Sequence, residues 1–343
     1  MSAGFIMPAE WSPQAAVQIT WPHPDTDWAP RLAGVLEVFS RIVVETSRHE
    51  DVLVACHNSQ VLAGCRRQLE KDGADMARCH LHVVPSNDSW TRDFGPITVR
   101  HPDGRRKLLD FGFNAWGLKF PADLDNQITR RLHALGAYGP LPLGIQGMIL
   151  EGGSIDSDGS GTILTTSACL LSPNRNPQWS REEITGQLCE LLGAERIFWL
   201  QSGYLEGDDT DAHIDTLARF CSTGTIAYQS CDDPVDTHFA PLQQMAAELA
   251  SFSQEDGQPY HLIPLPWPQA RFDSTGTRLP LSYANFLILN NAVLLPGYED
   301  PMDAVAAERL AGAFPGREIV IVPCLELVHQ HGSLHCVTMQ IPA

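Results

Sequence analysis

Four short turn signals, spaced about 55 to 70 residues apart, constrain the fold of this 343-residue chain more than any other feature. Each is a cluster of Gly, Asn, Asp or Ser between apolar runs, which is typical of a β-hairpin. The turns are expected at Asp103-Gly104, 156–161, 222–224 and Asn290-Asn291. A helical stretch and a further strand accompany each turn, so the spacing indicates a repeated hairpin-plus-helix unit of the kind found in propellers and arrays.

The two ends of the chain offer a fifth unit. The apolar run 17–21 can pair with the run 336–341, and this pairing would tie the ends together. An ordinary open α/β sheet is the alternative interpretation, because the repeats are faint. No linker rich in Pro, Gly or Ser divides the chain, so one domain over residues 1–343 is expected.

Apolar runs and helical periodicity predict that strands and helices alternate, which places the chain in the α/β class. Strands are expected at residues 51–56, 81–85, 97–100 and 107–113. Helices are expected at residues 34–48, 60–71, 126–135, 181–192, 241–252 and 302–314.

The charge balance is acidic. The chain has 23 Lys plus Arg against 41 Asp plus Glu, a formal net charge of −18. This excess argues against nucleic acid and anionic membranes as partners and favours cationic ligands. Solubility of a charged surface is the alternative explanation for the bulk charge.

No segment is typical of export or membrane insertion. Residues 1–30 lack a basic leader with an apolar run, and no stretch approaches about 18 apolar residues. The nine cysteines form no Cys-x-x-Cys pair, and their number is odd. Such scattered thiols indicate a reducing compartment, so a cytoplasmic location is expected.

Four short runs carry the residue types of covalent catalysis: 90–96, 151–153, 211–215 and 332–338. Cys336 is the candidate nucleophile, and a cysteine reacts as its thiolate, which needs a base or a cation nearby. His213 is the leading base, because Asp215, two residues on, would share its face of an extended strand. His335 would point to the opposite face from Cys336 and is the weaker candidate.

Each run also has a plainer interpretation. A single cysteine is most often a small buried hydrophobe. Arg92 and Asp93 could form an ordinary buried ion pair, and Glu151-Gly152-Gly153 could be merely a turn. Only the four runs together therefore indicate covalent catalysis.

The chain resembles the agmatine deiminase family, which is grouped with the bacterial peptidylarginine deiminases in the guanidino-group-modifying superfamily. The similar segments are 7–11 with Trp21-Pro22, 90–96, 110–119, 151–153, 211–220 and 332–342. They run in the same order from about residue 7 to the end of the chain. The resemblance implies a five-bladed pseudo-symmetric α/β propeller, the pentein fold, with the active site at its axis.

The resemblance also implies a role for each site residue. Cys336 would be the nucleophile and His213 the general acid and base, while Asp93 and Asp215 would grip the guanidinium nitrogens. Glu151 would contact both His213 and the substrate. A guanidinium presents a planar fork of N–H donors that carboxylates accept bidentately, so these residue types suit that substrate. Hydrolysis would pass through a covalent thiouronium and needs no metal or organic cofactor.

Agmatine is the expected substrate, and peptidylarginine, free arginine or another guanidino compound is the alternative. Asp208 and Asp209 are candidates to meet the second amine of agmatine, and Trp90 is a candidate to pack on its alkyl chain. Solvated loop acids are the alternative for both carboxylates. The resemblance also allows a homodimer.

The chain departs from the family pattern at two places. Residues 329–333 replace a common Gly-Gly-Gly-Asn run, which leaves the roles of His331 and Ser333 open. Ala212 stands where glycine usually precedes the histidine, and Thr216 stands where asparagine is common. These changes leave the catalytic set intact and bear on the agmatine pocket.

Two other classes of protein remain as alternatives. A metal hydrolase could use His213, Asp215, Asp93 and Glu151 as ligands, which suit Zn or Mn, but this leaves Cys336 without a role. A cation-binding protein without turnover is the second. If the site is a deiminase, its carboxylates are expected to raise the pKa of the Cys336 thiol until a guanidinium binds.

Overall fold

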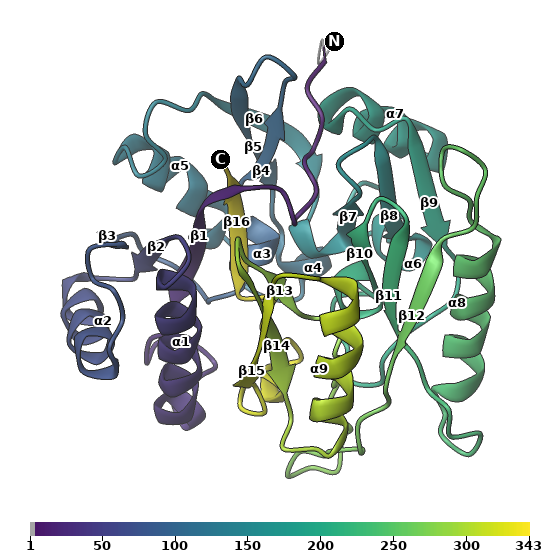
Figure 1. Cartoon of the computed structure of the whole chain (residues 1–343). Helices are drawn as coiled ribbons and strands as arrows, with labels where there is room; N and C mark the ends of the chain where they lie inside the picture. Colours follow the sequence, from purple (N-terminus) through teal and green to yellow (C-terminus); the bar gives the residue numbers. More distant parts are fainter. Residues whose placement is uncertain (1–3) are drawn as a thin grey trace.

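The computed structural model describes residues 4–343, which form five small sheets arranged around a common centre (Figure 1). Four sheets have three strands each: β4 (Ile97–Arg100), β5 (Arg106–Gly112) and β6 (Leu143–Ile149); β7 (Ile155–Ser157), β8 (Thr162–Thr166) and β9 (Arg196–Leu200); β10 (Ala218–Ser222), β11 (Thr225–Gln229) and β12 (His261–Leu265); β13 (Leu287–Ile288), β14 (Ala292–Gly297) and β15 (Glu318–Pro323). The fifth sheet has the order β16 (Thr338–Pro342), β1 (Gln14–Trp21), β2 (Asp51–Cys56) and β3 (Cys79–Val83).

The same pairing pattern recurs in every sheet. In the four three-stranded sheets, the first two strands form an antiparallel hairpin and the third pairs in parallel with the second. The four predicted turns lie in these hairpins, between β4 and β5, β7 and β8, β10 and β11, and β13 and β14. The repeated unit predicted from the turn spacing is therefore confirmed.

The chain ends complete the fifth unit. Strand β16 pairs antiparallel with β1, with Ile19 opposite Thr338, and β1 pairs in parallel with β2. The predicted closure is confirmed, and Figure 1 shows β16 beside β1 near the centre of the molecule. The alternative of one open sheet is wrong. Strand β16 begins at Thr338, so Cys336 lies in the turn before the strand.

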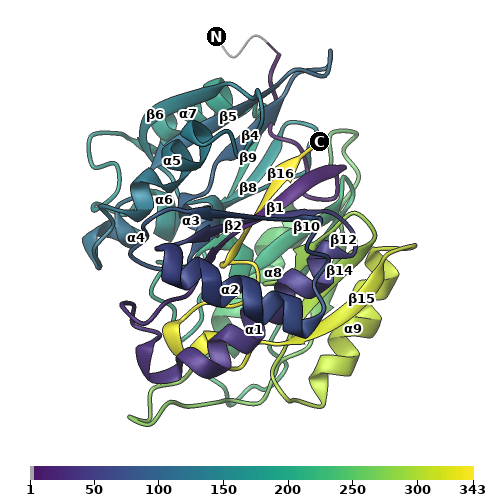
Figure 2. The ribbon, with the colours of Figure 1, turned by 90° about the vertical axis from the view of Figure 1, so that its left-hand side faces the viewer.

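The longer helices cover the outer faces of the sheets. They are α1 (Leu32–Ser47), α2 (Ser59–Asp72), α5 (Ile128–Ala134), α7 (Arg181–Leu192), α8 (Phe239–Ser251) and α9 (Met302–Ala313). Figure 2 shows α1 and α2 together on the outside of the sheet that contains β1 and β2. Within residues 4–343, no helix combines the length and the apolar character needed to cross a membrane.

Several element boundaries differ from the sequence prediction by one or more residues, for example α1, which begins at Leu32 instead of residue 34. Strand β3 starts two residues before the expected 81–85, because Cys79 already pairs with Val52 of β2. The expected helix 126–135 is divided into a 3₁₀ turn, η2 (Asp125–Gln127), and α5. Neither difference moves a candidate site residue.

Candidate active site

Each of the five units supplies a polar side chain from the residues directly before its leading strand. These are Asp93 before β4, Glu151 before β7, His213 and Asp215 before β10, Asn285 before β13, and Cys336 before β16. Short helical turns carry several of them: α3 (Thr91–Phe94), η3 (Gly152–Ser154) and η4 (Ile214–Thr216), and η3 packs on both α3 and η4. Pseudo-symmetry therefore brings residues from distant parts of the sequence together at the axis.

Cys336 is buried, with 4% of its surface exposed, and its sulfur faces two polar neighbours. The Asn285 Nδ2 atom lies 3.2 Å from Sγ, and Asp215 Oδ2 lies 3.7 Å from it. Asn285 also donates to the Asp215 main-chain oxygen at 3.3 Å and accepts from the His335 N–H at 2.9 Å. One amide side chain thus fixes the turn that carries the thiol against the turn that carries Asp215.

The geometry before β10 differs from the prediction. His213 and Asp215 do not share a face of an extended strand, because His213 caps η4 and Asp215 lies within that 3₁₀ turn. The His335 ring lies between two carboxylates, those of Asp215 and Glu10. Its Nδ1 lies 2.7 Å from Asp215 Oδ2, and its Nε2 lies 2.9 Å from Glu10 Oε1.

Asp93 is held by two donors. The Gly153 N–H donates to Oδ1 at 2.9 Å, and the Trp116 Nε1–H donates to Oδ2 at 2.8 Å. The alternative of an ordinary ion pair between Arg92 and Asp93 is wrong. Arg92 turns the other way, where its guanidinium lies 3.2 Å from Glu10.

His213 faces the same space as Asp93, with Nδ1 3.6 Å from Asp93 Oδ1. Both ring nitrogens are buried and have no hydrogen-bond partner among residues 4–343. A β-carbon added at Gly153 would lie 2.6 Å from His213 Nδ1, 2.8 Å from Asp93 Oδ1 and 3.1 Å from Asp215 Oδ2. Gly153 therefore borders the small space between these three side chains.

Glu151 is fixed by a buried arginine. The Arg175 Nε lies 2.8 and 3.0 Å from the two Glu151 oxygens, and Arg175 Nη1 lies 2.6 Å from Asp211 Oδ2. Glu151, Cys169 and His213 each place one donor atom within 4.8 Å of the others. This is a different set from the predicted metal ligands, and within the described residues Asp93 and Asp215 are not part of it.

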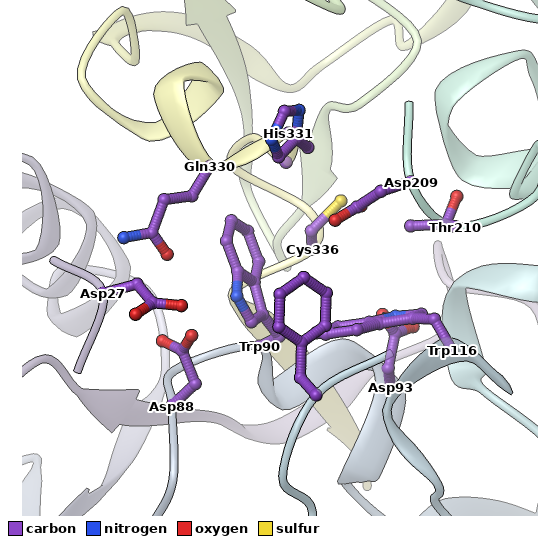
Figure 3. Close-up of a pocket in the computed structure, with 12 residues that line it drawn as sticks. Asp27, Asp88, Trp90, Asp93, Trp116, Asp209, Thr210, Gln330, His331 and Cys336 are labelled. Carbon is purple, nitrogen blue, oxygen red and sulfur yellow. The ribbon is translucent and has the colours of Figure 1, made fainter. Parts of the chain in front are cut away.

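A pocket of about 260 Å³ opens over the thiol (Figure 3). Its lining residues are Asp27, Asp88, Trp90, Asp93, Trp116, Phe120, Asp209, Thr210, Gln330, His331, Gly332 and Cys336. Trp90 and Asp209 line it as the sequence predicted. Asp208 does not, because its carboxylate accepts the main-chain N–H groups of Thr210 and Ala212 at 3.1 and 2.7 Å.

At both departures from the family pattern, a residue other than glycine has a positive φ. Ala212 has φ +64° and His331 has φ +68°, both in the left-handed region that favours glycine. His331 compensates with a side-chain contact, since its Nδ1 lies 2.6 Å from the Gly207 oxygen. The Thr216 hydroxyl donates to the His213 oxygen at 2.9 Å, which closes the turn behind the histidine.

Burial and neighbouring charges shift the protonation of the site. Burial, Asp215 and Asp93 raise the pKa of the Cys336 thiol well above its ordinary value. Burial raises the pKa of Asp93 to about 6, although His213 opposes this. Burial alone would lower the pKa of His213, but Asp93, Cys169 and Glu151 outweigh it and raise that pKa well above its ordinary value. Burial and the carboxylates thus favour the protonated forms of both the Cys336 thiol and the His213 imidazole.

The sequence interpretation missed several residues of the site. Glu10 and Trp116 lie inside segments that carried the family resemblance, but no role was assigned to them. Arg175 lies outside every such segment, and nothing in its local sequence marks it. Asn285 was detectable in principle, since it precedes β13 as Cys336 precedes β16.

Comparisons with known proteins show similarity to deiminases along nearly the whole chain. The family described as Porphyromonas-type peptidyl-arginine deiminase matches residues 6–342. The agmatine deiminase of Stutzerimonas stutzeri is 34% identical, and the match covers 99% of this chain and 96% of that protein.

Solved structures of deiminases also resemble this chain over nearly its whole length. A C. jejuni agmatine deiminase, a cysteine-to-serine variant with substrate bound, is 37% identical with a TM-score of 0.90, over 99% of this chain and 96% of that one. A proposed arginine deiminase from Porphyromonas gingivalis is 47% identical with a TM-score of 0.91, over 98% of each chain. The five-unit arrangement is thus the pentein fold, and this chain belongs to the Porphyromonas-type peptidyl-arginine deiminase family together with its agmatine deiminase relatives.

Proposed function

We propose that this chain is an agmatine deiminase, a single catalytic domain that hydrolyses agmatine to N-carbamoylputrescine and ammonia in putrescine biosynthesis. One observation carries the proposal. A buried thiol, Cys336, lies with the carboxylates of Asp93 and Asp215 beside a pocket that further acidic residues line. This arrangement suits a substrate with a guanidinium at one end and a second cation at the other.

The guanidinium group would bind between the two carboxylates. It stays charged at physiological pH and offers N–H donors in one plane. Asp93 Oδ1 and Asp215 Oδ2 both face the space beside Gly153, whose missing β-carbon leaves room there. Two charge-assisted pairs would hold the central carbon in line with the Cys336 sulfur.

Substrate would generate its own nucleophile. A bound guanidinium would neutralise the carboxylates that raise the pKa of Cys336 in the free enzyme, so the thiol would release its proton to solvent and become a thiolate. The Asn285 Nδ2 donor, 3.2 Å from Sγ, would stabilise that thiolate. The sulfur then attacks the guanidinium carbon and forms a tetrahedral adduct.

His213 would move the protons of both half-reactions. As imidazolium it donates a proton to the departing nitrogen, ammonia leaves, and a covalent thiouronium remains on Cys336. The neutral imidazole then takes a proton from water, which attacks the same carbon. The new hydroxyl gives its proton to the departing sulfur, so the ureido product and the neutral thiol are released. Glu151, held by Arg175 near the ring, favours the imidazolium form that begins the first step and is restored by the second.

The residues that line the pocket suit agmatine better than free arginine. Of the residues described as lining the pocket, none is Arg or Lys, so nothing with a fixed positive charge awaits the carboxylate of free arginine. In Figure 3, Asp27 and Asp88 lie on one side of the Trp90 ring and Asp209 on the other. Asp209 is our candidate partner for the agmatine amine, and Trp90 for its alkyl chain.

The test is turnover of agmatine, arginine and a blocked arginyl peptide, measured as ammonia and ureido product. We expect agmatine alone to react, and Cys336→Ala to abolish the reaction. Turnover of arginine or of the peptide instead would refute the substrate, and metal-dependent turnover that survives in Cys336→Ala would refute the mechanism. The homodimer and the cytoplasmic location stay predictions.

The partner of the amine can be tested separately. Loss of one charged contact is worth about 1.5–3 kcal/mol, so Asp209→Asn should raise KM for agmatine about 10- to 100-fold with little change in kcat. Asp27→Asn and Asp88→Asn are the matched variants, because they line the same pocket. A larger KM effect in either of them would move the amine site to that side of Trp90.

A further inference from the structure

His335, the residue directly before the nucleophile, is a buried ring with a carboxylate on each side. It is 1% exposed, and its Nδ1 lies 2.7 Å from Asp215 Oδ2. Its Nε2 lies 2.9 and 3.2 Å from the two carboxylate oxygens of Glu10. Glu10, His335 and Asp215 thus form a row of three side chains, and the Asp215 end of this row lies 3.7 Å from the Cys336 sulfur.

Glu10 is the fixed end of the row. Arg92 Nη1 lies 3.2 Å from its Oε1, Gln340 Nε2 donates to its Oε2 at 2.9 Å, and Arg219 Nη2 donates to Oε2 as well. Burial alone would raise the pKa of Glu10, but the two arginines and His335 outweigh it and lower that pKa well below its ordinary value. Glu10 is therefore an ionised carboxylate that several donors hold in place.

Asp215, at the other end, has far fewer donors. Its side chain is fully buried, and within residues 4–343 its carboxylate has the His335 Nδ1 and the Cys336 thiol as donors. Its Oδ1 has no hydrogen-bond partner in this part of the chain. A buried carboxylate oxygen without a donor costs free energy, and an N–H group of a bound cation would remove that cost.

The proton on His335 Nδ1 follows from these contacts. Burial alone would raise the pKa of Asp215, but the hydrogen bond from His335 helps to lower it, so Asp215 is ionised and only accepts. Burial and two arginines lower the pKa of His335, and the two carboxylates oppose that shift. Because Glu10 has other N–H donors and Asp215 has none among the described side chains, the contact of the ring with Asp215 is the one that the row supplies.

We propose that His335, held by Glu10, is a positioning residue that orients the Asp215 carboxylate toward the guanidinium. The inference rests on the proposed function, in which Asp215 grips that group. Charge-assisted hydrogen bonds are short and directional, so a ring fixed at Nε2 sets the direction of the carboxylate at Nδ1. A site residue keeps its productive geometry when such contacts lock its rotamer. The ring occupies one direction at Oδ2 and leaves Oδ1 for the substrate.

The experiment measures how fast Cys336 is alkylated by chloroacetamidine, a planar cation with N–H donors, and by chloroacetamide, its neutral analogue. In both reactions the sulfur displaces chloride, so a C–S bond forms, a C–Cl bond breaks and the thiol proton goes to solvent. Mass spectrometry of the peptide that contains Cys336 gives both rates in the full-length protein. A change in thiol reactivity moves both rates, whereas the ratio of the two rates reports how well the carboxylates hold a cation.

His335→Asn and His335→Gln are a matched pair of variants. The amide nitrogen of Asn can take the place of Nδ1 and keep a donor for Asp215, and that of Gln can take the place of Nε2 and keep a donor for Glu10. We expect His335→Asn to keep the rate ratio within about threefold of wild type, and His335→Gln to lower it about 10- to 100-fold, with parallel effects on kcat/KM for agmatine. His261→Asn, which changes an exposed histidine on β12, is the control and should leave both quantities unchanged.

Urea unfolding of each variant shows whether it is folded under the labelling conditions. If His335→Gln does not fold, Glu10→Gln tests the row from its other end and should lower the ratio about three- to tenfold. Equal ratios in the two His335 variants, or a wild-type ratio in Glu10→Gln, would overturn the positioning role. A wild-type ratio near one would overturn the assignment of Asp215 to the cation. A high wild-type ratio that differs between the two His335 variants, without turnover of agmatine, would support the positioning role and refute only the proposed substrate.

Discussion

Replacing Gly153 with Ala would place one methyl group where His213, Asp93 and Asp215 face one another. The new β-carbon would lie 2.6 Å from His213 Nδ1. Ordinary van der Waals contact begins near 3.4 Å, so the imidazole would have to move by about 3.4 − 2.6 = 0.8 Å. The methyl would also occupy the space that we assign to the guanidinium.

A misplacement of about 1 Å costs on the order of 10²-fold in rate, or about 2.7 kcal/mol of transition-state stabilisation. We therefore expect Gly153→Ala to lower kcat/KM for agmatine by at least about 100-fold. The backbone of Gly153 is outside the left-handed region, so alanine adds no backbone strain. Crowding of the side chains should cost about 1–3 kcal/mol of the free energy of unfolding.

The assay is steady-state ammonia release, paired with urea unfolding of the same preparations. Gly64→Ala is the matched control, because an added β-carbon there would meet no atom within 4 Å, and it lies in α2. That variant should keep full activity and gain up to about 1 kcal/mol of stability. A Gly153→Ala enzyme within about threefold of wild-type activity would refute the geometry argued for the guanidinium.

Three further predictions follow from the same site. The pKa of Asp93 is raised to about 6, so below that pH this carboxylate becomes protonated and no longer pairs with the guanidinium. We therefore expect kcat/KM to fall about tenfold per pH unit below about pH 6. A flat profile down to pH 5 would contradict this. Ala212→Gly should raise the free energy of unfolding by about 0.5–1 kcal/mol with unchanged kcat, because it relieves the positive φ; a loss of stability in urea unfolding would exclude that strain. Arg175→Met should lower the free energy of unfolding by about 3–5 kcal/mol, because it leaves Glu151 buried without its partner. Arg175→Met/Glu151→Gln should recover part of that loss. Additive effects in the double-mutant cycle would show that the pair is not coupled.

Local sequence patterns were sufficient for the hairpins, the longer helices and the number of units, but the bounds of the third strands, β6, β9, β12 and β15, were not predicted. Turn residues between apolar runs act through neighbouring atoms, so the four hairpins and the helix Arg181–Leu192 were predictable. The family resemblance supplied Cys336, His213, Glu151, Asp93 and Asp215 as candidates. Their roles in the reaction stay proposals until the variants are measured.

Only the tertiary structure decided how the site is assembled. Asn285 bonds to the turn of Cys336 across 51 residues, and Arg175 reaches Glu151 across 24, and neither contact leaves a local signal. The extended-strand interpretation of His213 and Asp215 failed because the turn before β10 is 3₁₀. The sequence by itself determined which segments fold into hairpins and helices, since short-range sterics and burial control them. Which side chains meet at the axis was decided by closing five units on one centre, because that closure sets distances between atoms that are remote along the chain.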